Sequence, residues 1–157
     1  MAVRSLPSDV SISVAHAGKA LSESFEKRAT CEAKQNENWN WLGSISHPKA
    51  QQLMRSSDVL INSSRAEGAP NVLFEALSWR LPVLASKIDG HLGVLGSSYP
   101  GYFNVGDTKQ LRKLLIRCCG DKSFYAELVR CTDSLAKSYA PGNELKCLLA
   151  AIAAARK

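Results

Sequence analysis

The chain has 157 residues, of which 45% are hydrophobic and 22% are charged, and its formal net charge is +6. This size and balance are typical of one soluble globular domain with a sizeable core. No apolar run approaches the roughly 20 residues that a membrane-spanning helix needs, and the N-terminus lacks the apolar core of a signal peptide. Basic residues are spread along the chain among acidic ones, which favours solvated faces over a nucleic-acid-binding surface.

Cysteine and histidine positions argue against a disulfide framework and a metal site. The five cysteines are odd in number and form no C-x-x-C pair, so we expect reduced thiols in a cytoplasmic protein. The histidines, His16, His47 and His91, have no metal-ligand spacing, and His47 fits a helix cap better than a catalyst. The sequence therefore predicts neither a metal ion nor a cofactor.

Short apolar runs alternate with helical patterns along most of the chain. The runs predict strands over 10–15, 38–43, 57–62, 82–86 and 102–104. Helices are expected over 19–35, 46–56, 70–79, 108–119, 122–139 and 143–156. This order predicts an α/β fold, a Rossmann-like parallel sheet with helices on both faces. Ligands of such sheets bind beyond the carboxyl ends of the strands.

The segment 65–77 is the most informative part of the sequence. It follows an apolar run, and its Pro70 suits the first turn of a helix, where a missing N–H costs nothing. Asn71, Glu75 and Ser78 recur at helical spacing, so they form a polar stripe on an otherwise apolar helix.

A second carboxylate, Glu67, lies in the loop ahead of this helix, beside N–H groups that have no intrahelical partner. A helix N-terminus binds phosphate or sugar oxygens, and carboxylates accept hydrogen bonds from hydroxyl groups. Together these groups indicate a pocket for a polyhydroxylated, anionic ligand. The alternative is that Glu67 and Glu75 form only caps or ordinary salt bridges.

The segment also carries a family resemblance. Glu67 and Glu75 with the residues between them resemble the E-x7-E signature of retaining GT-B glycosyltransferases in the large family four, and 81–90 is similar to that family's next strand and loop. Phrases at 13–18, 94–96 and 99–108 resemble the bacterial selenosugar synthases of selenoneine biosynthesis.

The resemblance implies a single nucleotide-sugar-binding domain over residues 1–157, the C-terminal half of a GT-B fold. It implies a fragment of a longer two-domain enzyme whose N-terminal acceptor domain is missing, so the isolated chain is expected to be inactive. The expected reaction transfers a glycosyl group from a nucleoside diphosphate sugar, a UDP-sugar by analogy, with selenophosphate as the acceptor in the subgroup.

The resemblance also assigns roles to residues. It places Glu67 near the donor sugar as the catalytic residue, and it lets Glu75 accept hydrogen bonds from the ribose hydroxyls. The backbone between them would approach the sugar and diphosphate at Gly68, Ala69, Pro70, Asn71 and Val72. No D-x-D pair is present, which fits a metal-free mechanism with the leaving diphosphate held at the helix end.

Residues after the first two predicted strands are further donor-binding candidates. Gly18 permits close approach of a phosphate and Lys19 offers a point charge, although a plain strand-to-helix turn also explains both. In the family, the loop that begins at Gly43 meets the nucleotide base, largely through backbone groups. Trp39 and Trp41 are more typical of a core than of a base-stacking platform.

Two positions depart from the family pattern. Arg80 stands where the family usually has glycine, so the helix before it must be capped differently. The loop 88–93 lacks the acidic residue that often follows the family's paired glycines, which agrees with the selenosugar subgroup. Two other hypotheses stay open: a non-catalytic nucleotide or sugar-phosphate binding module, and a protein-interaction domain with a vestigial site.

Overall fold

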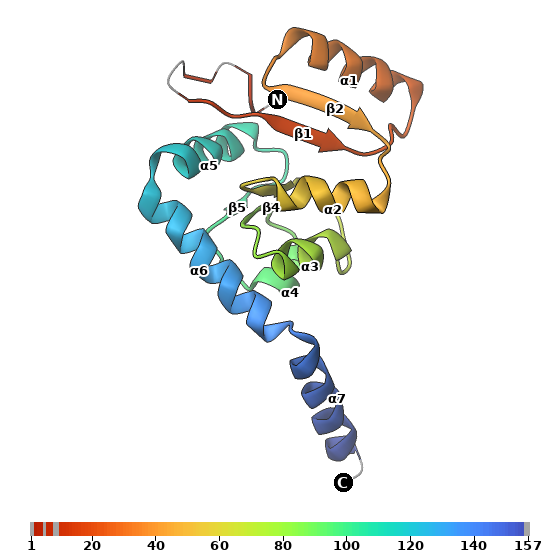
Figure 1. Ribbon diagram of the computed structural model, residues 1–157, viewed down its shortest axis with the longest axis vertical. Coiled ribbons are helices and arrows are strands. Elements are labelled where there is room, and N and C mark those ends of the chain that lie inside the picture. Colours follow the sequence, from red (N-terminus) through yellow and green to blue (C-terminus); the bar gives the residue numbers. More distant parts are fainter. Residues whose placement is uncertain (1, 5, 8–9, 156–157) are drawn as a thin grey trace.

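The computed structural model describes residues 2–4, 6–7 and 10–155, in which strands and helices alternate along the chain (Figure 1). The strands are β1 (Val14–Ala17), β2 (Trp39–Gly43), β3 (Leu60–Asn62), β4 (Val83–Ser86) and β5 (Tyr102–Phe103). The helices are α1 (Glu23–Gln35), α2 (His47–Arg55), α3 (Asn71–Ser78), α4 (Asp89–Leu95), α5 (Thr108–Gly120), α6 (Lys122–Ser138) and α7 (Pro141–Ala155).

All strand pairs are parallel, as the alternating pattern predicted. Ile61 pairs with Leu84, and Ala85 pairs with Tyr102, so β3, β4 and β5 form one sheet in that order. Strand β1, which begins four residues later than predicted, pairs with β2 in a second sheet. The expected single sheet is therefore divided. Among the described residues, no hydrogen-bonded strand pairing joins β1 or β2 to β3, β4 or β5.

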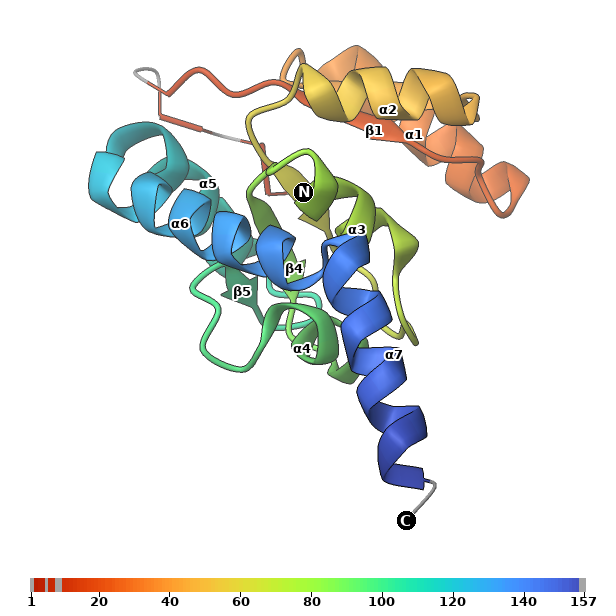
Figure 2. The same ribbon diagram turned by 60° about the horizontal axis from the view of Figure 1, so that its bottom comes forward.

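The core surrounds the three-stranded sheet. Every residue of β4 is buried, as is usual for a parallel strand that is covered on both faces. Leu73 and Leu77 of α3, together with Phe124 and Leu128 of α6, are at most 2% exposed. In both views α1 with β1 lies at one end of the molecule, and α7 projects from the other (Figures 1 and 2). No helix in the described ranges is long and apolar enough to cross a membrane.

Helix starts follow familiar capping chemistry. Asp107 accepts a hydrogen bond from the Gln110 amide at 2.9 Å, and Asp121 accepts one from the Phe124 amide at 3.0 Å. Helix α2 has Pro48 in its first turn, where a missing N–H costs nothing. The sequence analysis missed α4, a seven-residue helix that contains two glycines.

Helix α3 was expected to be capped differently because Arg80 stands where the family usually has glycine, but this expectation is wrong. Arg80 adopts φ = 54°, in the left-handed region. The Leu81 amide bonds to the Ala76 carbonyl at 2.9 Å and the Arg80 amide to the Leu77 carbonyl at 3.0 Å, which is the Schellman pattern. A side chain in this conformation costs about 1–2 kcal/mol. Arg80 also forms an ion pair with Asp133 of α6 at 3.5 Å.

Candidate functional site

The loop between β3 and α3 is held by hydrogen bonds at its base. The buried Asn62 side chain accepts a bond from the Ser64 amide at 3.2 Å. The Ser64 hydroxyl donates to Glu67 Oε1 at 2.7 Å, and the Ser86 hydroxyl donates to the Ser64 carbonyl at 2.5 Å. Because Ser86 ends β4, these bonds fix the Glu67 loop at the carboxyl ends of two neighbouring strands.

A glycine in α4 lets that helix approach the same loop closely. A Cβ at Gly90 would lie 2.3 Å from the Glu67 carbonyl oxygen and 2.4 Å from that of Gly68. Both distances are far below van der Waals contact, so only glycine fits here. The position of the Glu67 backbone therefore depends on Gly90.

Helix α3 begins with free hydrogen-bond donors. Its N-cap is Pro70, which is buried and supplies no side-chain cap. The amides of Asn71 and Val72 have no hydrogen-bond partner among the described residues. Such amides, at the positive end of the helix dipole, favour an anionic ligand such as a phosphate.

One turn further along α3, Glu75 faces α2. Its side chain is 32% exposed. Oε2 accepts a hydrogen bond from Gln51 Nε2 at 2.8 Å, and Oε1 lies 3.3 Å from His47 Nε2. The interpretation of His47 as a helix cap is wrong, because Ser46 occupies the N-cap position and the imidazole faces Glu75 instead.

The residues that follow β4 have structural roles. His91 is fully buried, and its Nδ1 donates to the Ser86 carbonyl at 2.6 Å, so this nitrogen carries the proton. Tyr99 and Tyr102 donate to the carbonyls of Val83 and Gly96, at 2.9 and 3.0 Å. Burial raises the pKa of each tyrosine to about 12, so both stay protonated donors at physiological pH.

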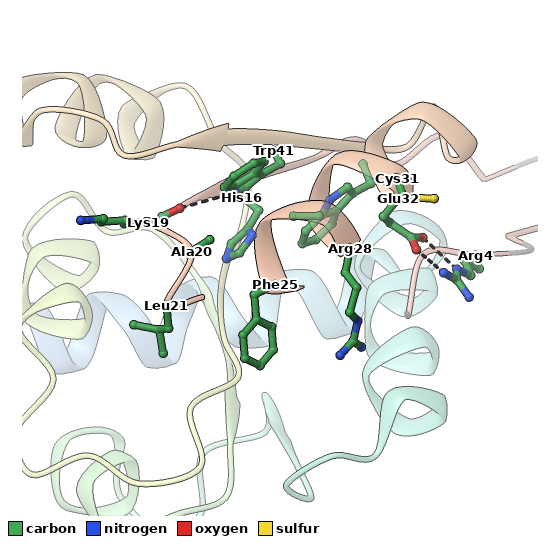
Figure 3. A pocket seen from close by; sticks show the side chains of 13 residues that line it. Arg4, His16, Lys19, Ala20, Leu21, Phe25, Arg28, Cys31, Glu32 and Trp41 are labelled. Atoms are coloured by element: carbon green, nitrogen blue, oxygen red, sulfur yellow. Dashed lines mark hydrogen bonds and ion pairs between the residues drawn. The ribbon is translucent and has the colours of Figure 1, made fainter. Parts of the chain in front are cut away.

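A cavity of about 530 Å³ lies elsewhere, between α1 and the two-stranded sheet (Figure 3). It is lined partly by apolar and aromatic side chains, and Leu21, Phe25 and Arg28 project together on one side of it (Figure 3). At its edge the Arg4 guanidinium hydrogen-bonds to the buried Glu32 carboxylate, which lowers the pKa of Glu32.

Gly18 and Lys19 line this cavity, whereas Glu67 and Glu75 do not. The Gly18 amide donates to the Gly43 carbonyl at 2.8 Å, and the Gly18 carbonyl accepts from Trp41 Nε1 at 3.1 Å. Gly18 and Gly43 are thus adjacent, but the amide of Gly18 is already bonded. A phosphate contact at this position remains a prediction.

The structure adds site residues that the sequence analysis did not single out: Gln51, Ser64, Ser86 and Gly90. Ser86 carried a signal, since it is the one polar residue of a buried strand. Gly90 carried none, because the helix that contains it was not predicted. Gln51 and Ser64 carried none, because their partners lie on another element or depend on the loop conformation. No group of three or more His, Cys, Asp or Glu within the described residues could hold a metal ion.

Comparison with known proteins places this geometry in a family. A family model described as "Glycosyl transferases group 1" matches residues 1–130. The chain belongs to this family. No curated protein matches it.

Several solved structures of larger chains have the same fold. The structure of HepE from Anabaena in complex with UDP has a TM-score of 0.74 and 20% identity, and the match covers 92% of this chain and 41% of HepE. HepE in complex with UDP-glucose matches with a TM-score of 0.68 and 21% identity over 80% of this chain and 36% of that one. TarM matches with a TM-score of 0.70 and 17% identity over 90% and 28%. The chain thus spans about two fifths of the length of HepE, and the shared fold is the C-terminal Rossmann-like half of GT-B enzymes.

Proposed function

We propose that this chain is the donor-binding domain of a glycosyltransferase that uses a nucleoside diphosphate sugar. The observation that carries the proposal is the start of α3, where the unpartnered amides of Asn71 and Val72 lie one turn before the Glu75 carboxylate. This spacing suits a diphosphate at the helix end and a ribose beside the carboxylate. Family membership and the solved complexes of HepE with UDP and UDP-glucose support it.

In the proposed reaction the bond between the anomeric carbon and the diphosphate oxygen breaks, and the diphosphate leaves with the electron pair. The α3 amides stabilise the growing negative charge of the leaving group. Glu67, held by Ser64 and by the close approach of Gly90, supplies a carboxylate near the sugar carbon where positive charge develops. The acceptor atom then forms the new bond to that carbon.

The other residues that we propose for donor binding lie in the loop before α3 and at two strand ends. The backbone of the loop contributes through Gly68, Ala69 and Pro70, and the carboxyl ends of β1 and β2 contribute through Gly18, Lys19 and Gly43. An N-terminal acceptor domain is the proposed partner within a longer protein, and the fraction of HepE and TarM that the chain covers supports it.

The finer proposal is an E-x7-E enzyme of family four that transfers a sugar from UDP to selenophosphate. It rests on the resemblance of 13–18, 94–96 and 99–108 to selenosugar synthases. Incubating the full-length enzyme with UDP-sugars and selenophosphate tests it. A phosphorylated selenosugar detected by mass spectrometry supports the subgroup, and transfer only to other acceptors contradicts it.

Calorimetric titration of this chain with UDP and UDP-glucose tests the donor site itself. We expect saturable binding that Glu75→Gln weakens about tenfold or more, since a hydrogen bond to a charged group contributes about 1.5–3 kcal/mol. Glu37→Gln removes the same charge at an exposed turn and should leave the affinity unchanged. No saturable binding would favour a vestigial site, and binding without glycosyl transfer by the full-length protein would favour a non-catalytic binding module.

A further inference from the structure

Helices α2 and α3 face each other through two pairs of side chains with helical spacing. Gln51 and Arg55 lie four residues apart on α2, and Glu75 of α3 lies four residues before Trp79, the C-cap of that helix. The Arg55 guanidinium lies 3.8 Å from the centre of the Trp79 ring, and Gln51 bonds to both Trp79 and Glu75. Four side chains thus form one continuous contact between the helices.

The direction of these hydrogen bonds is determined by Trp79. An indole N–H can only donate, so the Gln51 atom that it contacts must be the carbonyl oxygen Oε1. The amide NH₂ group of Gln51 is then the end that faces Glu75, and Nε2 lies 2.8 Å from Oε2. Arg55 stacks on the same indole, which favours a single ring orientation.

His47 is a weaker candidate for the same task. Its side chain is 71% exposed, and its Nε2 lies 3.3 Å from both Glu75 Oε1 and Gln51 Nε2. One ring nitrogen can donate to the carboxylate or accept from the amide, but it cannot do both. Gln51 is half-buried, and its two bonds are consistent in direction.

We infer that Gln51, oriented by Trp79, is the positioning residue that holds the Glu75 carboxylate for the ribose hydroxyls. The inference rests on the proposed function of Glu75. A free glutamate loses considerable rotamer entropy when a ligand fixes it. Because Gln51 already restricts the Glu75 side chain before the ligand binds, less rotamer entropy is lost on binding. Gln51 occupies one acceptor direction of Oε2, and a carboxylate has about four, so directions remain open for two hydroxyl groups.

The test compares UDP with 2′,3′-dideoxy-UDP, which lacks both ribose hydroxyls. Affinities of the 157-residue chain for each are measured by calorimetry. Gln51→Leu keeps the side-chain size and removes both hydrogen bonds. We expect it to weaken UDP binding about tenfold, as for one weakened charge-assisted bond, and dideoxy-UDP binding less than twofold. Trp79→Phe keeps an aromatic ring beside Arg55 and removes the N–H together with the five-membered ring of the indole, so it should weaken UDP binding selectively but less strongly.

Gln52→Leu is the matched control, since Gln52 is the exposed neighbour on the same helix and should change neither affinity. Equal weakening of both ligands by Gln51→Leu would mean a merely structural role and would overturn the inference, as would no change at all. Glu75→Gln separates this failure from that of the proposed function. If Glu75→Gln removes the preference for UDP while Gln51→Leu keeps it, only the inference fails. If Glu75→Gln keeps the preference, or the wild-type chain does not bind UDP, the ribose site fails and the inference fails with it.

Discussion

Replacing Gly90 by alanine tests how strictly α4 holds the Glu67 loop. The added Cβ would lie 2.3 and 2.4 Å from the carbonyl oxygens of Glu67 and Gly68, whereas ordinary contact begins near 3.4 Å. Both carbonyls would therefore have to retreat by about 1 Å. Overpacking of this kind costs about 1–3 kcal/mol, and the better helix propensity of alanine offsets only about 0.5–1 kcal/mol of it.

We expect Gly90→Ala to lower the free energy of unfolding by about 1–2 kcal/mol, which corresponds to a Tm lower by roughly 2–8 °C for a chain of this size. Gly93→Ala in the same helix is the control, because a Cβ there meets nothing within 4 Å. It should instead stabilise by about 0.5–1 kcal/mol. In the proposed full-length enzyme, a 1 Å displacement of the Glu67 loop should lower kcat by up to about 100-fold. If urea unfolding shows Gly90→Ala to be as stable as Gly93→Ala, the close approach of α4 has been misjudged.

Three other predictions concern separate parts of the fold. In the proposed full-length enzyme, Glu75→Ala should raise the donor KM by roughly tenfold or more, since the proposed ribose contact is equal in ground and transition states. Glu67→Ala should mainly lower kcat. Steady-state kinetics that gave the reverse would exchange the two roles. The Arg80→Gly variant should have a free energy of unfolding about 0.5–1 kcal/mol higher than that of Arg80→Ala. Both variants lose the ion pair with Asp133, but only glycine relieves the strain of the positive φ. Equal stabilities in urea would contradict this prediction. At Asp121, hydrogen bonds from Ser123, from the Phe124 amide and from Arg117 lower the pKa of the carboxyl group from 3.8 to about 2. The ionised carboxylate therefore contributes to stability above pH 3.8, and this contribution is lost as the pH falls towards 2. The Tm difference between wild type and Asp121→Asn should therefore shrink over that range, and a constant difference would show that the carboxylate charge has no part in it.

The parallel order of the strands and the position of α3 were predictable from the sequence because each rests on a local signal. Strand β4 is an apolar run that follows Pro82. Helix α3 begins directly after Pro70, which the sequence predicted in the first turn and which the structure places at the N-cap, and it carries a regular stripe of Leu73, Ala76 and Leu77. The crossover helix between β3 and β4 then requires these strands to be parallel. Both confirmed predictions depend on residues close together in the chain.

Helix α4 and the divided sheet were not predictable in the same way. Two glycines within seven residues lower the helix propensity of α4, and the helix forms because His91, Val94 and Leu95 are buried against the rest of the fold. Strand β1 was expected in the same sheet as β3 and β4, but among the described strands it pairs only with β2, because the pairing of strands depends on contacts between distant parts of the chain. In each case tertiary packing decided the outcome.

The environment of Glu75 shows the same limit at the level of chemistry. Sequence spacing identified the carboxylate and its stripe on α3, but the groups that orient it come from α2, 24 residues earlier in the chain for Gln51. Only the fold brings Gln51 and Trp79 into contact, and only the donor chemistry of the indole shows which end of the Gln51 amide faces the carboxylate. A sequence motif can therefore identify a candidate ligand-binding carboxylate. The orientation of that carboxylate is determined by a neighbouring helix that the motif does not contain.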